Sequence, residues 1–355
     1  MESKATITLA LSVLGAIGLF GWAQAPPAAT RTGPGVQAAQ DAKEPDVLKT
    51  CKVPPPARGG RGGGAPGRGA AAGPPPLPAP HDYKVTAIPG VVADGVQWKE
   101  FWKVSGNNAD GIIGTKDGGL LIAQNDNSAV VKLDKNGKAS TAYSGTNTGG
   151  ALSMNSKGVL FLNNRGLNAD ILELAPRRQS FANKYNGDSF DCIGGVLNDL
   201  AADSKGGVYF TMGGLYYADP KGVVKSYGKD LRTNGIVLSP DEKVLYVTNG
   251  PTLAAFDVQP DGSLNNQREF AKFEGGGDGS TVDAMGRIYV TAGYNVHVIS
   301  PEGKLLGSIP TPRSLISAAF SGKGKKTLYV VARTNDDDWI LGIPMLTSGF
   351  KGRAK

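Results

Sequence analysis

A short strand pattern recurs six times along this chain of 355 residues, and the repetition limits the fold more than any other feature. Each copy is a β-rich run, a turn and a second β-rich run, as in "NDLAADSKGGVYFT", "NGIVLSPDEKVLYVT" and "DGSTVDAMGRIYVT". A fourth clear copy reads "DGIIGTKDGGLLIA", and two further copies are weaker. In chain order the copies start at Asp110, Gly150, Asn198, Asn234, Asp278 and Ser317. Helix-period segments are nearly absent beyond residue 83, so the pattern predicts an all-β fold.

The spacing of the copies predicts a six-bladed β-propeller. Successive starts are 40, 48, 36, 44 and 39 residues apart, and periods near forty in an all-β chain are typical of propeller blades. One four-stranded blade cannot bury both of its faces, and six stacked around an axis supply the missing neighbours. The segment "VTAIPGVVADGVQWKEFWKV" precedes the first copy and is expected to complete the last blade. A β-sandwich is the alternative, although six units in one register are hard to explain that way.

Composition divides the chain into three parts. Residues 1–25 combine a lysine, an apolar run and the small residues Ala23 and Ala25, which predicts a cleaved export signal. The alternative is a retained membrane anchor, because the run is nearly long enough to span a bilayer. Residues 26–82 are rich in Gly and Pro and are expected to stay a disordered linker, whereas residues 83–355 can bury a large core. The sequence therefore predicts a periplasmic or secreted propeller, tethered to a membrane only if the signal is retained.

The linker carries RGG-like repeats and one of the two cysteines of the chain. The arginines of these repeats, Arg58, Arg61 and Arg68, contribute to the net charge of +7, but no aromatic residues alternate with them. Because RNA-binding segments of this kind combine positive charge with aromatic stacking, a plain spacer is favoured and no nucleic-acid partner is expected. Cys51 in the linker and Cys192 in the domain could form one disulfide after export. Nothing in the sequence demands that they do.

Four of the six copies begin with an oxygen-bearing side chain: Asp110, Asn198, Asn234 and Asp278. The strand nearest the axis leads each propeller blade, so these equivalent positions are expected to form a ring at one mouth of the channel. Two carboxylates and two amides suit a hard cation such as Ca²⁺, with Zn²⁺, Mg²⁺ and Mn²⁺ as alternatives. Asn-Gly and Asp-Gly are also common where a chain turns into a strand. An ordinary turn is therefore the competing interpretation.

The two histidines do not suggest a site of their own. His81 lies beside the linker, and His297 alternates with apolar residues in "YNVHVIS". This alternation is typical of a packed or surface histidine. A histidine-based zinc site and a Ser-His-Asp triad are therefore not expected.

Three stretches resemble the gluconolactonase–regucalcin (senescence marker protein) family of six-bladed propellers: "YNGDSF…LNDLAADSKGGVYFT", "GLYYADPKGVVKSYGKDLRTNGIVLSPDEKVLYVTN" and "DGSTVDAMGRIYVTAGYNVHVISPEGKLLGSIPTP". The likeness covers most of residues 85–345. It implies a divalent metal, commonly calcium, on the axis and, for many members, hydrolysis of lactones.

The resemblance also implies roles for the four ring residues. Asn234 matches the ligand asparagine of the NG motif, and Asp278 matches the aspartate that binds the metal and is proposed as general base. Asn198 matches an asparagine near the substrate or metal. Asp110 falls where the family usually has a glutamate ligand.

Three departures from the family pattern stand out. Asp110 is one methylene shorter than the usual glutamate. Val196 replaces an arginine that contacts substrate in some animal members, and Ser317 replaces a frequent asparagine. These differences put sugar-lactone specificity in doubt.

Together these features predict a metal-dependent hydrolase that opens a small-molecule lactone or related ester. Asp278 and Asn198 are the predicted catalytic residues, and Asp110, Asn198, Asn234 and Asp278 the predicted metal ligands. Asp199 is expected to be structural, because strand alternation points it away from Asn198. The alternative is a non-catalytic exported propeller that binds a ligand or acts as a scaffold. A monomer is expected, and RNA binding through the linker ranks last.

Overall fold

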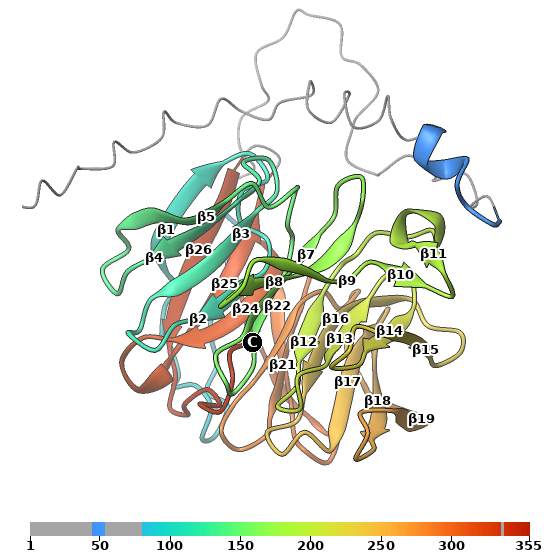
Figure 1. The fold of residues 1–355 in the computed structure, drawn as a ribbon. Helices are drawn as coiled ribbons and strands as arrows, with labels where there is room; N and C mark the ends of the chain where they lie inside the picture. Colours follow the sequence, from blue (N-terminus) through green and yellow to red (C-terminus); the bar gives the residue numbers. More distant parts are fainter. Residues whose placement is uncertain (1–44, 54–79, 335–336) are drawn as a thin grey trace, which may run out of the picture. The chain divides into compact units, whose positions relative to one another are not determined.

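A computed structural model describes residues 45–53, 80–334 and 337–355, which are mostly β-strands (Figure 1). The predicted signal at residues 1–25 and most of the predicted linker lie outside these ranges. Within them, no helix has the length and apolar character needed to cross a bilayer.

The described residues form six four-stranded sheets, one for each predicted repeat, with the strands of blades 1–5 arranged in chain order. The strands of the first three blades have the following bounds. Blade 1 contains β2 (Ile112–Gly114), β3 (Leu120–Gln124), β4 (Ala129–Leu133) and β5 (Ala139–Ser144). Blade 2 contains β6 (Leu152–Met154), β7 (Leu160–Asn164), β8 (Asp170–Ala175) and β9 (Gln179–Ala182). Blade 3 contains β12 (Leu200–Ala202), β13 (Val208–Thr211), β14 (Leu215–Ala218) and β15 (Val224–Tyr227).

The other three blades continue the same arrangement. Blade 4 contains β16 (Thr233–Leu238), β17 (Val244–Asn249), β18 (Thr252–Val258) and β19 (Leu264–Lys272). Blade 5 contains β20 (Ser280–Val282), β21 (Ile288–Ala292), β22 (Asn295–Ile299) and β23 (Leu305–Pro310). Blade 6 contains β24 (Ser314–Ser321), β25 (Thr327–Arg333), β26 (Asp337–Pro344) and β1 (Lys99–Ser105).

The first strands of the six blades contact one another in a closed ring around the axis: β2, β6, β12, β16, β20 and β24. Blade 6 takes its outer strand from the beginning of the propeller, because β1 pairs antiparallel with β26 in a register that places Lys103 opposite Trp339. This confirms both the six-bladed propeller and the predicted closure of the ring by the segment before the first repeat.

The strand β17 shows why the repeats contain apolar runs rather than a simple alternation. Leu245 and Val247 pack with Tyr209 of blade 3, whereas Tyr246 faces the other way and packs with Val290 of blade 5. A strand with a blade on either side buries both of its faces, so nearly every position is apolar. Burial of this area between blades is the main force that holds the ring together.

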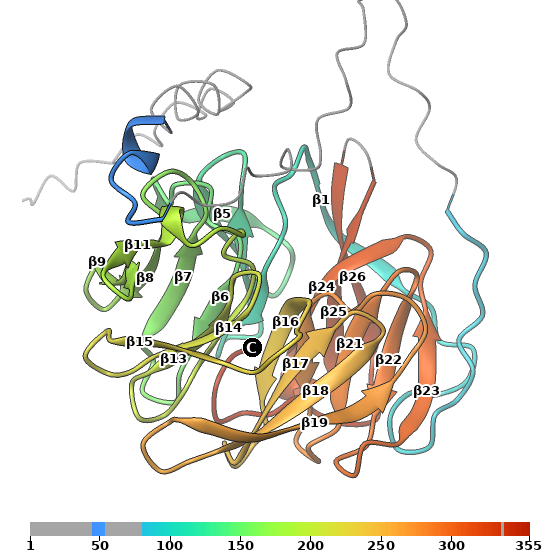
Figure 2. The same cartoon turned by 90° about the vertical axis from the view of Figure 1, so that its right-hand side faces the viewer.

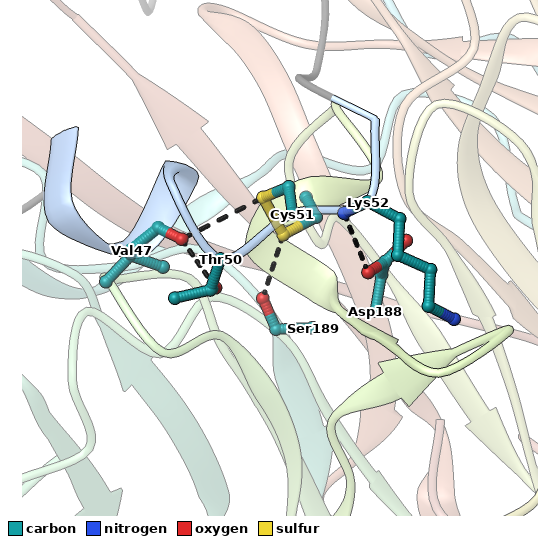
Figure 3. Close-up of a disulfide and its surroundings, with 7 residues drawn as sticks. Val47, Thr50, Cys51, Lys52, Asp188 and Ser189 are labelled. Carbon is teal, nitrogen blue, oxygen red and sulfur yellow. Dashed lines mark hydrogen bonds between the residues drawn. A yellow bond between two sulfur atoms is a disulfide. The ribbon is translucent and has the colours of Figure 1, made fainter.

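Between blades 2 and 3, the longest repeat interval holds three extra elements: β10 (Lys184–Tyr185), β11 (Asp188–Ser189) and the 3₁₀ turn η1 (Phe190–Cys192). A second 3₁₀ turn, η2 (Lys323–Lys325), lies between β24 and β25. Cys192 in η1 forms a disulfide with Cys51, with their Cα atoms 5.4 Å apart (Figure 3). The pairing that the sequence left open is thus present.

The disulfide holds residues 45–53, which belong to the predicted linker, against the domain. These residues include one helical turn at 45–48. The Lys52 backbone N–H donates to Asp188 Oδ1 at 3.2 Å (Figure 3). Lys52 Nζ also donates to the Asn186 carbonyl at 2.6 Å. A covalent cross-link offsets much of the ordering entropy that such a polar segment would otherwise have to overcome.

Residues 345–355 form a tail that ties several blades together where their innermost strands end. In both views the end of the chain lies among these strands (Figures 1 and 2). Ala354 packs against Ile113 of blade 1. Backbone bridges and hydrogen bonds join the tail to other blades: Gly349 to Asp283, Ala354 to Met154, and Arg353 Nη2 to the carbonyls of Leu238 and Ser239.

Candidate functional site

The four predicted site residues occupy equivalent places at the start of four innermost strands. Asp110, Asn198 and Asp278 each stand two residues before the strand of their blade, and Asn234 is the second residue of β16. All four are half-buried. In blades 1, 3 and 5 the backbone N–H of the site residue donates to a backbone carbonyl of the second strand of its blade. The acceptors are Ala123 at 3.1 Å, Thr211 at 2.9 Å and Thr291 at 2.7 Å. The repeat therefore places these side chains at one level around the axis.

The glycine after three of these residues has a structural role that differs from the turn interpretation. None of Gly111, Gly235 and Gly279 has a positive φ. A Cβ on Gly235 would lie 2.0 Å from the Asp278 carbonyl oxygen, and one on Gly111 would lie 2.6 Å from the Ala151 Cα. Glycine is present because adjacent innermost strands approach too closely for a side chain. These three glycines are therefore explained by strand packing, and no turn with a left-handed glycine forms at these positions.

Three carboxylates near the axis, those of Asp110, Asp199 and Asp278, lie close enough for their charges to interact, and this region is called the hub. Burial raises the pKa of Asp278 to about 7, and the negative charges of Asp110 and Asp199 add to the rise. The guanidinium groups of Arg165 and Arg333 oppose it. Residues that are far apart in sequence thus converge on the axis.

Asp110 has protein partners that the sequence did not indicate. Arg165 Nη1 forms an ion pair with Asp110 Oδ2, and Asn125 Nδ2 donates to the same oxygen at 2.9 Å. Burial alone would raise the pKa of Asp110, but Arg165, Arg333 and these hydrogen bonds outweigh it and lower the pKa. Asp110 is therefore held as a carboxylate, with its partners gathered on one oxygen.

The other ring side chains keep polar atoms that form no hydrogen bond with any described residue. Among the described residues, no hydrogen bond reaches the Asp278 carboxylate or the side-chain amides of Asn198 and Asn234, and none reaches Asp110 Oδ1. These oxygens are therefore available to an added ligand. Two carboxylates and two amides form a donor set that fits a hard divalent cation. No group of three or more His, Cys, Asp or Glu side chains in the described part of the chain could hold a metal, so such an ion would need both the acids and the amides.

Asp199 faces the framework rather than this set of oxygens. Its Oδ2 accepts the backbone N–H of Ile236 in blade 4 at 2.9 Å, and its Oδ1 accepts the N–H of Leu200 at 2.9 Å. Lys355 Nζ forms an ion pair with Oδ1 and donates to the Leu200 carbonyl at 2.9 Å. These contacts join blade 3 to blade 4 and to the tail, as expected for a structural aspartate.

His297 is a packed histidine, as its alternation with apolar residues predicted. Its side chain is buried. Nδ1 lies 2.8 Å from Ser308 Oγ, and Nε2 lies 2.9 Å from the Glu274 carbonyl. The ring stacks on Phe273 with 5.2 Å between centroids.

Comparison with known proteins identifies a family for this chain and solved structures that share its fold. Residues 146–334 match the family model described as the SMP-30/gluconolactonase/LRE-like region. A gluconolactonase from Zymomonas mobilis subsp. mobilis is 27% identical over 192 residues, which cover 45% of this chain and 53% of that protein. The chain spans about half the length of the curated relatives it matches.

Two solved structures share the propeller. A gluconolactonase from Xanthomonas campestris aligns with a TM-score of 0.62 at 22% identity, over 78% of this chain and 99% of that one. A calcium-binding regucalcin from Agrobacterium tumefaciens aligns with a TM-score of 0.58 at 17% identity, over 72% and 98% of the two chains. At these identities the likeness shows the fold.

Proposed function

The chain belongs to the SMP-30/gluconolactonase/LRE-like family, and from this premise we propose that it hydrolyses a lactone or related ester at the axial ring. The lactone-opening relatives and the gluconolactonase fold support this proposal. The substrate would be a small molecule, because the ring residues converge within one hub rather than along an extended surface.

The observation that carries the proposal is the set of hub oxygens that no described protein group engages. Asp110 through Oδ1, Asn198, Asn234 and Asp278 would hold a divalent cation, with Ca²⁺ as the ion that best suits two carboxylates and two amides. The regucalcin fold and its calcium binding are consistent with this ion. When bound, the cation supplies Lewis-acid polarisation of the ester carbonyl and activation of water.

Each hub residue then has a part in hydrolysis. Asp278 accepts a proton from the attacking water, whose oxygen adds to the carbonyl carbon. The carbonyl π pair moves to the carbonyl oxygen and returns as the acyl C–O bond of the ring breaks. Asp278 gives the proton to the departing ring oxygen, so one water is consumed and a hydroxy acid is formed. Asn198 and Asn234 orient the substrate and keep the hub less negative than four carboxylates would.

The ion pair of Asp110 supports a second candidate function. Arg165 already neutralises Asp110, and Lys355 neutralises Asp199. Two of the three hub carboxylates thus have a protein cation, which suits a propeller that binds a ligand or acts as a scaffold without catalysis. The unengaged Asp278 favours the hydrolase.

We also propose that the protein acts as an exported monomer. The Cys51–Cys192 disulfide supports export, because disulfides persist in oxidising compartments such as the periplasm or the extracellular space.

The test combines metal content with a lactone panel that includes glucono-δ-lactone and γ-butyrolactone. The parent is expected to bind one divalent ion and to open at least one lactone. Asp278→Ala should lose both, with a fall in kcat/KM of about 10²-fold or more because a general base contributes 10²–10⁴-fold. Asp261→Ala, at an exposed turn where the carboxylate caps Ser263, is the matched control. A parent that holds stoichiometric metal but opens no ester would favour the binding module.

A further inference from the structure

Arg165 fills the one sector of the ring that lacks a side chain of its own. The repeat start in blade 2 is Gly150, and a Cβ there would lie 1.8 Å from Arg165 Cζ. Arg165 follows β7 and reaches back over this glycine, with 16% of its side chain exposed. The hub therefore contains a guanidinium at the same level as its four oxygen-bearing side chains.

The contacts of Arg165 place it between two of the predicted site residues. Nη1 pairs with Asp110, and Nη2 donates to the Asn198 carbonyl at 2.6 Å. The charge of Arg165 also acts on Asp278. An oxygen atom bound near Asn198 and Asp278 would therefore lie close to this cation.

Arg333, the second guanidinium near the hub, is committed to the framework. Its Nε and Nη2 form a two-point contact with the buried Asp338 at 2.7 and 3.1 Å, and Nη2 also donates to the Ala109 carbonyl at 3.0 Å. Arg333 thus joins blade 6 to blade 1, whereas Arg165 lies over Gly150 within the ring.

We propose that the Arg165 guanidinium binds the lactone carbonyl oxygen as it gains negative charge, and afterwards the carboxylate of the opened product. The inference rests on the proposed hydrolysis and identifies the group that stabilises the negative charge developing on the carbonyl oxygen. Planar guanidinium groups match carboxylates in geometry and form charge-assisted hydrogen bonds with them. Because the carbonyl oxygen takes the π pair when water adds, a fixed cation beside it lowers the barrier.

The first test measures product binding in the absence of turnover. The full chain is titrated with 4-hydroxybutyrate in EDTA, so that a divalent ion does not contribute, and binding is followed by ligand-detected NMR. Arg165→Met should weaken binding at least 10-fold, and Arg165→Lys should fall between Met and the parent. Arg177→Met is the matched control, because this exposed arginine pairs with Glu173 in the same blade and outside the ring.

A variant of Asp110 separates carboxylate binding from mere support of the ring. Asp110→Asn removes the ion-pair partner and leaves the guanidinium, so product binding should hold or tighten. If Arg165 only braces Asp110, Asp110→Asn and Arg165→Met should weaken binding alike. That result, or a parent that shows no binding of 4-hydroxybutyrate, would overturn the proposal. Circular dichroism confirms that each variant folds, and Arg165→Lys carries the test if Arg165→Met does not.

The second test uses turnover of whichever lactone the parent opens. Arg165→Ala should lower kcat/KM by about 10²–10³-fold, the loss typical of one oxyanion donor, and added guanidinium ions should restore part of it. Undiminished activity in this variant would contradict the role of Arg165 and leave the hydrolase intact. A parent that opens no lactone would contradict the hydrolase, and the EDTA titration would still decide whether Arg165 binds carboxylates.

Discussion

At the scale of single residues, the hub is a balance of acids and bases. Asp110 pairs with Arg165 and Asp199 with Lys355, whereas Asp278 has no such partner among the described residues. Removing charges from water is costly unless they are paired, so the pairs account for how three carboxylates can share one hub. The remaining acid is the one whose pKa rises to about 7, because burial and its two neighbours both oppose its ionisation.

Burial of His297 should make the stability of the fold depend on pH. Nε2 of His297 faces the Glu274 carbonyl, which can only accept, so the neutral ring must donate from Nε2 and accept from Ser308 at Nδ1. Burial lowers the pKa of His297 below the ordinary histidine value of 6.5. The unfolded chain therefore binds this proton more readily than the folded chain does.

We accordingly expect the free energy of unfolding to fall as the pH drops below about 6.5, the unfolded pKa of histidine. Above that pH the contribution of His297 is fully present. Urea unfolding at a series of pH values between about 7 and 5 measures the slope, and His297→Gln should reduce it. An unchanged slope in His297→Gln would show that other groups carry the acid sensitivity.

At the scale of the element, the spacing between the innermost strands is set by how closely their backbones can approach. Gly111, Gly235 and Gly279 follow ring residues, and each meets the backbone of the next blade at a distance that excludes a Cβ. The same strands end in turns where a side chain caps the backbone. In blade 3, for example, Asp203 Oδ1 accepts the N–H groups of Gly206 and Gly207 at 2.7 Å. Glycine thus controls spacing at one end of the strand, and a capping acid controls the turn at the other.

Gly235→Ala should therefore push blades 4 and 5 apart at the hub. The added Cβ would lie 2.0 Å from a backbone oxygen that cannot rotate away, and overpacking of this kind costs about 1–3 kcal/mol. Urea unfolding measures the loss, and a fall in the affinity of the proposed metal site should accompany it because Asn234 and Asp278 flank the contact. Gly276→Ala is the control: a Cβ there meets nothing within 4 Å and φ is not positive. Equal stability of the two variants would show that the strands separate at no cost.

At the scale of the whole molecule, the ring is closed at several levels. The strand β1 completes blade 6, the tail at residues 345–355 crosses the innermost strands, and a disulfide fixes residues 45–53. Each closure joins parts of the chain that are far apart in sequence. Such links limit how far one blade can open without its neighbours.

The tail should contribute through the Lys355–Asp199 pair, whose side chains are only 7% and 11% exposed. Lys355→Met leaves a buried carboxylate without its partner, which typically costs about 3–5 kcal/mol. The double variant Asp199→Asn/Lys355→Met removes both charges and should recover part of the loss, so a double-mutant cycle isolates the pair. Chemical unfolding monitored by tryptophan fluorescence provides the free energies. Additive losses in the cycle would contradict a direct interaction.

The sequence determined the architecture, because strand periodicity and turn spacing are local properties that repeat with each blade. It predicted the six units from their starts, the closing strand from the segment before Asp110, and the level of the four ring residues from their shared register. The role of the glycines was not visible, since a dipeptide such as Asn234-Gly235 looks the same in a turn and in a crowded strand.

The tertiary structure alone decided which distant groups meet at the hub. Arg165 reaches the ring because Gly150 leaves room for it, and Lys355 reaches Asp199 because the tail crosses the blades. The Cys51–Cys192 bond likewise depends on where residues 45–53 return to the propeller. No local pattern marks these contacts, because each depends on the direction of a side chain after the blades have packed. The charge around a bound ligand is consequently a property of the closed ring.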